Sequence, residues 1–121
     1  MALRIDNDAE MAVTGAWGSV NLTALRNRLA RAVDEDEAGA RPSVREVYAV
    51  VEGFSAPSQE WGYPHHVIRN DTVVLHAGGV QAATQRARQQ NNTRALAHLR
   101  GHARALLQAG KVESSVLVDE D

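Results

Sequence analysis

The stretch that decides the fold is His66-Val67-Ile68-Arg69-Asn70-Asp71-Thr72-Val73-Val74-Leu75-His76, two β-prone runs on either side of an Asn-Asp pair. Valine, isoleucine and threonine favour extended backbone, because their branched side chains pack well on a pleated surface. Asn70 and Asp71 both tolerate the dihedral angles of a tight two-residue turn. The pattern therefore predicts a β-hairpin over residues 66–76.

Three other segments have apolar residues at helical spacing, which predicts helices at about 22–33, 80–90 and 94–109. Asn21 is a suitable N-cap for the first helix. Gly78-Gly79 ends the hairpin and precedes the second helix. Asn91-Asn92-Thr93 provides a turn and cap before the third, and Gly110 is a suitable C-terminal stop.

The segment Ser43–Glu52 allows two interpretations. Ser43-Val44-Arg45-Glu46 has the form of a capping box, which favours a helix, whereas the short run 47–51 is rich in strand-forming residues. We expect a strand at about 47–51 that joins the hairpin. The predicted fold class is therefore α+β, with one small antiparallel sheet (hairpin about 66–76 plus a strand about 47–51) packed against the three helices.

A chain of 121 residues is the size of one domain, so we expect residues 1–121 to fold as a single unit. Residues 1–18 show no helical pattern, with at most a short strand near Leu3–Ile5. The acidic run Asp34–Glu37, closed by Arg41-Pro42, predicts a solvated connecting loop over 34–42. The tail 112–121 either adds an edge strand or stays flexible.

The composition excludes several classes of protein. The chain has no cysteine, which excludes a disulfide framework, a thiolate metal site and a cysteine nucleophile. No apolar run approaches the roughly 20 residues that a membrane-spanning helix needs. The first residues lack the basic-then-apolar pattern of a secretory signal. We therefore expect an intracellular protein without a membrane partner.

The net charge of −2 hides an uneven distribution. No acidic residue lies between Asp71 and Glu113, a stretch that contains Lys111 and five arginines: Arg86, Arg88, Arg94, Arg100 and Arg104. These arginines are the candidate partner-binding residues, and they suit either an acidic protein surface or nucleic acid. We favour a protein partner, because this stretch has no aromatic residue to stack on bases and the whole chain is mildly acidic.

All five histidines fall between positions 65 and 102. His98 and His102 are four residues apart on the third predicted helix, the spacing of helical zinc ligands, and His65 or His66 could complete a site with them. Adjacent residues of an extended chain point to opposite faces, so only one of His65 and His66 is expected to face the helix. We therefore favour buried histidines that donate hydrogen bonds and pack beside Trp61, with no cofactor or metal; a zinc site is the alternative.

Motifs for catalysis are missing from the chain. No Gly-x-Ser-x-Gly turn marks a nucleophile, no glycine-rich loop marks a phosphate site, and paired carboxylates occur only in the acidic runs. The sequence predicts that the protein is not an enzyme.

The order Trp61, Pro64-His65-His66, Ala82-Ala83 with Arg86, and Ala97-His98-Leu99 with His102 resembles a small module of tailed bacteriophages, often accompanied by an upstream pair such as Ala16-Trp17. The module occurs near or within head-assembly proteins such as capsid maturation proteases. The resemblance covers residues 60–107 and, loosely, 16–54, and no protease portion is present. It implies a head- or virion-associated accessory protein, found in the virion or the host cytoplasm, whose partners are capsid or other head proteins. Apart from the resemblance, a second copy of the chain is a further candidate partner.

Overall fold

A computed structural model describes residues 2–112 of the chain. The predicted α+β class is confirmed: helices predominate, beside two small sheets. The strands are β1 (Arg4–Asp6), β2 (Tyr48–Val51), β3 (Trp61–Pro64), β4 (His66–Arg69) and β5 (Thr72–Leu75). The α-helices are α1 (Leu22–Asp34), α2 (Ala40–Val47), α3 (Pro57–Glu60), α4 (Ala77–Gln89) and α5 (Thr93–Gln108), and short 3-10 helices cover Ala9–Met11 and Trp17–Ser19.

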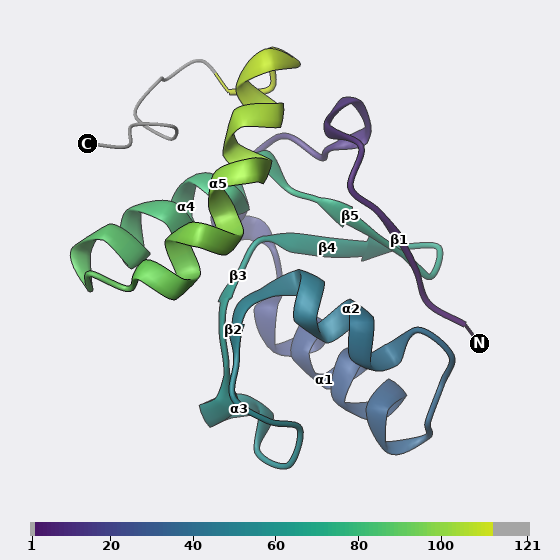
Figure 1. Cartoon of the computed structure of the whole chain (residues 1–121). Coiled ribbons are helices and arrows are strands. Elements are labelled where there is room, and N and C mark those ends of the chain that lie inside the picture. The colour runs from purple at the N-terminus through teal and green to yellow at the C-terminus, as the bar shows by residue number, and fades with distance from the viewer. Residues whose placement is uncertain (1, 113–121) are drawn as a thin grey trace.

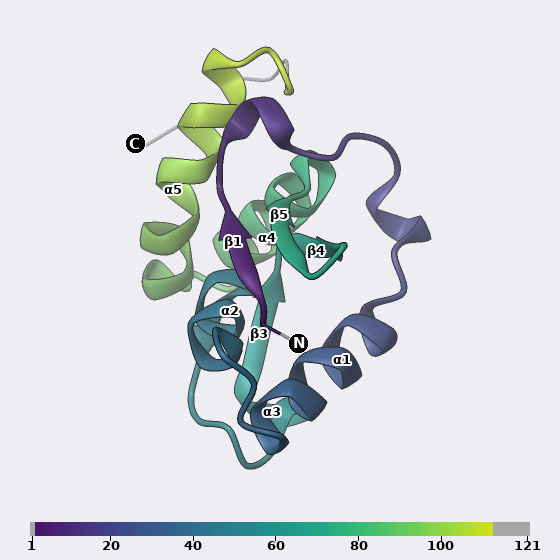
Figure 2. The ribbon, with the colours of Figure 1, turned by 90° about the vertical axis from the view of Figure 1, so that its right-hand side faces the viewer.

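The hairpin is confirmed in its predicted place. β4 and β5 pair antiparallel, and the turn residues Asn70 and Asp71 have φ angles of 52° and 60°. β1 pairs in parallel with the free edge of β5, which gives the strand order β1-β5-β4 (Figure 2). A three-stranded sheet thus replaces an isolated hairpin, which would be marginally stable.

The prediction that the strand at 47–51 joins the hairpin sheet was wrong. β2 pairs antiparallel with β3 in a separate two-stranded sheet, with Val51 opposite Trp61. Figure 1 shows these two strands running from near the α4–α5 pair down to α3, with the α1–α2 pair beside them. The separate pairing arises because the chain turns between β3 and β4, so that the hairpin leaves the β2–β3 ribbon.

The ambiguous segment 43–52 contains both predicted structures in succession. Residues 40–47 are helical and residues 48–51 are extended, with no loop between them. The helix begins three residues before Ser43, because Gly39 turns the chain at a φ of 80°. Residues 40–42 therefore belong to α2, which shortens the predicted loop 34–42, and the prediction of only three helices was wrong.

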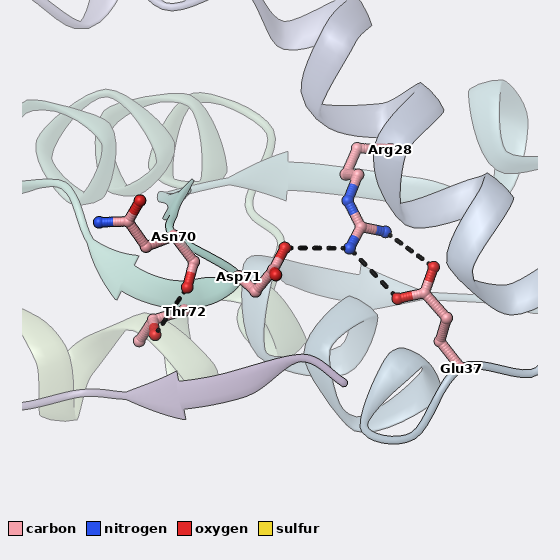
Figure 3. Close-up of polar contacts among 5 residues, drawn as sticks. All are labelled: Arg28, Glu37, Asn70, Asp71 and Thr72. Atoms are coloured by element: carbon pink, nitrogen blue, oxygen red, sulfur yellow. Dashed lines mark hydrogen bonds and ion pairs between the residues drawn. The ribbon is translucent and has the colours of Figure 1, made fainter. Parts of the chain in front are cut away.

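The acidic connector is also less solvated than predicted. Arg28 on α1 makes two hydrogen bonds of 3.2 Å to the Glu37 carboxylate and a third, of 3.4 Å, to Asp71 in the hairpin turn (Figure 3). The paired geometry suits a guanidinium opposite a carboxylate. These ion pairs link the connector and the hairpin turn to α1.

Two of the three predicted helices start and end within a residue or two of their predicted limits. Asn21 and Asn92 accept backbone N–H groups of α1 and α5 at 2.9 Å, as their cap positions predict. The middle helix, α4, begins at Ala77 instead of about 80, because both glycines of Gly78-Gly79 lie in its first turn. The predicted tail 112–121 lies almost wholly outside the described residues.

The core is built mainly from small aliphatic side chains. Between α4 and α5 the buried residues are Ala83, Ala87, Ala95 and Leu99, which allow the two helices to approach closely. Trp61 lies in the core between α1, α2 and β2, where its ring centre is 5.3 Å from that of Tyr48. None of the described helices has the length and apolar character needed to cross a membrane.

Candidate functional site

Four histidines come together where the bend between β3 and β4 meets α5; we call them the histidine cluster. His65 lies at the bend, His66 begins β4, and His98 and His102 lie one turn apart on α5. The His65 ring centre is 5.0 Å from that of His98 and 5.4 Å from that of His102, and the latter two are 5.6 Å apart. The ring of His66 lies 4.5 Å from His65 and 5.5 Å from His102.

The expectation that only one of His65 and His66 faces the helix was wrong. Alternation holds within one strand, but His65 lies between two strands that belong to different sheets. Its backbone N–H donates to Val47 beside β2, whereas its carbonyl accepts from His76 beside β5. The chain switches sheets at this residue, so both rings reach α5. The expected packing beside Trp61 is also wrong, since Trp61 packs against Tyr48 and Phe54.

Hydrogen bonds define which ring nitrogen of His65 carries the proton. Its Nδ1 lies 2.9 Å from the carbonyl oxygen of Tyr63, which can only accept, so Nδ1–H is the donor. Nε2 then has the free lone pair. This atom lies 3.2 Å from Nε2 of His98, which is also 3.3 Å from the carbonyl oxygen of Glu46.

A second chain of hydrogen bonds defines His66. Asn7 donates through Nδ2 to the Glu46 carboxylate at 2.6 Å, so its Oδ1 accepts, at 2.8 Å, from Nε2–H of His66. Nδ1 of His66 therefore has a lone pair, and this atom is buried without a hydrogen-bond partner. The same Glu46 carboxylate lies 3.2 Å from Nε2 of His102.

The surroundings keep the cluster largely uncharged. His65 and His66 are fully buried, and burial lowers the pKa of His65 to about 3 and that of His66 well below its usual value. Burial and the neighbouring His102 lower the pKa of His98 as well. The hydrogen bond from His102 lowers the pKa of Glu46. The imidazoles of His65, His66 and His98 are thus neutral at neutral pH, and they lie near one ionised carboxylate.

The fifth histidine, His76, has a separate role. Its Nδ1 accepts the backbone N–H of Gly79 at 3.1 Å, which caps α4, and its ring lies edge-on to Trp17 at 4.9 Å. A ring so engaged stabilises the helix start.

The five candidate partner-binding arginines do not form one surface. Arg86 and Arg88 are two residues apart on α4 and so project in nearly opposite directions. Arg94 pairs with Glu52 at 3.1 Å and also donates to the carbonyl of Val51. The remaining two, Arg100 and Arg104, are exposed and lie about one turn apart on α5.

Arg86 instead lies at a groove of about 640 Å³ between α4 and the aromatic residues of β3, which we call the aromatic groove. Trp17, Trp61 and Tyr63 line it, together with Gln85, Arg86 and Gln90. The Tyr63 hydroxyl donates to Gln90 and accepts from Asn92 at 3.2 Å, which fixes one wall. Sequence reasoning missed this groove, as it missed Glu46 and Asn7, because each is assembled from distant segments.

No protein-family model, curated protein or solved structure matches the chain. Two features of the molecule itself bear on its function: the histidine cluster and the aromatic groove.

Proposed function

We propose that this protein is a non-enzymatic accessory component of a tailed-phage head that works by binding another head protein through the aromatic groove. The single observation that carries this proposal is that exposed Arg86 lines the same groove as the half-buried Trp17 and Tyr63, with the buried Trp61 also in its wall. Tryptophan, tyrosine and arginine are the residue types that dominate binding energy at protein interfaces. The resemblance of residues 60–107 to a phage head module supplies the context.

The charge around the groove favours an acidic segment of the partner. Arg86 is exposed, and residues 72–112, which include both helices α4 and α5, contain no acidic residue. The guanidinium plane can pair with a carboxylate through two hydrogen bonds. The neighbouring Gln85 is uncharged and suits hydrogen bonds to a backbone, and Gln90, whose oxygen accepts from Tyr63, can still donate through its amide nitrogen. We infer that the partner inserts an extended, carboxylate-bearing segment.

Nucleic acid is the other partner that an arginine-rich stretch suits. A nucleic-acid surface needs several cations aligned along a phosphate backbone. Arg86 and Arg88 project to different sides of α4, and Arg94 is paired with Glu52. The arrangement therefore supports a local protein contact better than an extended phosphate track.

The test is incorporation of charge-reversal variants into phage particles that lack the native protein. Arg86→Glu is expected to reduce the amount in purified particles by roughly 5- to 30-fold, as a loss of about 1–2 kcal/mol of binding requires. Arg4→Glu is the matched control, because Arg4 is exposed on β1 outside the groove. Equal incorporation of both variants would refute the groove as the docking site. A tight, saturable DNA mobility shift at physiological salt, lost in Arg86→Glu, would favour nucleic acid instead.

A further inference from the structure

The geometry points to a binding site for one divalent transition-metal ion of the zinc type, with His65, His98 and His102 as its three nitrogen ligands. Each offers a ring nitrogen, and the three nitrogens lie within 4.8 Å of one another. The inference is independent of the proposed docking function, because it depends on the histidine cluster alone.

The spacing of the rings matches what a tetrahedral ion requires. Zn–N bonds of about 2.0–2.1 Å place two ligand nitrogens roughly 3.3–3.4 Å apart and their ring centres about 5 Å apart. Nε2 of His65 and Nε2 of His98 are 3.2 Å apart, and the three ring centres are separated by 5.0, 5.4 and 5.6 Å. Three imidazoles from two distant segments thus lie nearly equidistant.

The ligands also have the supporting contacts that metal-binding histidines use. Such a histidine donates its second ring N–H to a carbonyl or carboxylate, which orients the ring. His65 donates Nδ1–H to Tyr63, and this directs Nε2 toward His98. His102 has the Glu46 carboxylate 3.2 Å from its Nε2, and Asn7 holds that carboxylate in place. Glu46 and Asn7 are therefore positioning residues.

Simple packing explains the cluster less well. In the metal-free protein Nε2 of His98 lies 3.2 Å from Nε2 of His65 and 3.3 Å from the Glu46 carbonyl oxygen, so its single N–H is shared and the buried lone pair of His65 is poorly satisfied. If these side chains served only to fill the core, apolar residues would stabilise it more, because burying a nitrogen without a good hydrogen bond costs free energy. His66 and Glu46 also form a second ligand set with His102. His102 is 16% exposed, which gives an ion access from solvent.

Binding an ion here would join parts of the chain that are far apart in sequence. His65 belongs to the β3–β4 bend, and the other two ligands belong to α5, which lies beside that bend in Figure 1. Because the unfolded chain does not hold these groups together, the free energy of metal binding becomes free energy of folding. The inferred role of the ion is to hold α5 against the bend between β3 and β4.

The experiment is a calorimetric titration of the chelator-treated, full-length protein with Zn²⁺, paired with thermal unfolding. We expect one equivalent bound per chain and a higher Tm in the presence of Zn²⁺. His98→Gln and His102→Gln should each weaken Zn²⁺ binding by more than about tenfold. Loss of a residue that only positions a ligand already weakens metal binding by about tenfold, and loss of a ligand should weaken it more. Glu46→Gln should weaken it by about 10- to 100-fold.

His76→Gln is the matched control, since His76 is buried but lies outside the cluster. It should keep one equivalent and the wild-type affinity. Should His98→Gln fail to fold, the partly exposed His102 still provides the test. The inference is overturned if the wild-type protein takes up less than a stoichiometric amount of Zn²⁺. It is equally overturned if His102→Gln binds Zn²⁺ as tightly as His76→Gln.

Discussion

Gly79 offers a sharp test of the packing at the start of α4. A Cβ atom placed on Gly79 would lie 2.7 Å from Cζ3 and 2.8 Å from Cε3 of Trp17, well inside ordinary contact distance. Helix propensity alone would favour Gly79→Ala by about 1 kcal/mol. The Trp17 ring would have to move away, however, and this movement would disturb its edge-on contact with His76. Forcing extra volume into a packed site costs about 1–3 kcal/mol, so we expect a net loss of stability.

The matched control for Gly79→Ala is Gly101→Ala. Gly101 is exposed within α5, and a Cβ there would meet nothing within 4 Å. The same substitution should then raise the free energy of unfolding by about 0.5–1 kcal/mol. Urea unfolding followed by circular dichroism measures both values. The reasoning is refuted if Gly79→Ala stabilises the protein as much as Gly101→Ala does.

Three further outcomes are expected. In the chelator-treated protein, the free energy of unfolding should fall as the pH drops below 6.5, because the unfolded chain then binds protons that the buried His65 and His66 do not bind in the folded state. Each of these histidines contributes up to about 1.4 kcal/mol per pH unit. Urea unfolding that gives the same stability at pH 7 and pH 5 would contradict this. Arg28→Lys should lower the free energy of unfolding, measured in urea, by about 1 kcal/mol, since an ammonium group cannot make both hydrogen bonds to Glu37. An unchanged free energy of unfolding would show that the pair contributes nothing. Asn21→Ala should cost about 1 kcal/mol by removing the cap of α1, and thermal unfolding at the wild-type Tm would disprove that role.

The parts of the fold that could be predicted from the sequence depend on local chemistry. The Asn70-Asp71 turn has the positive φ angles that its residues tolerate, and the asparagine caps begin their helices as expected. The β2–β3 ribbon was not predictable, because Trp61-Gly62-Tyr63-Pro64 contains glycine and proline, which are depleted in strands. Its pairing depends on tertiary contacts that no local pattern records.

In the histidine cluster, too, the features set by local sequence were predictable and those set by tertiary contacts were not. The spacing of His98 and His102 on one helix predicted that they share a face, and the contact between their rings confirms it. Strand alternation failed at His65, since the chain changes sheets there. Glu46 and Asn7 gave no signal, because Asn7 contacts His66 across 59 residues of chain and Glu46 contacts His98 across 52.

The most direct test of the histidine site is anomalous diffraction, above and below the zinc absorption edge, from crystals of the protein grown with Zn²⁺. We predict one strong peak among the rings of His65, His98 and His102, about 2.0–2.1 Å from one nitrogen of each. An empty cluster, with Nε2 of His98 still hydrogen-bonded to His65 and any zinc bound elsewhere on the surface, would contradict the account.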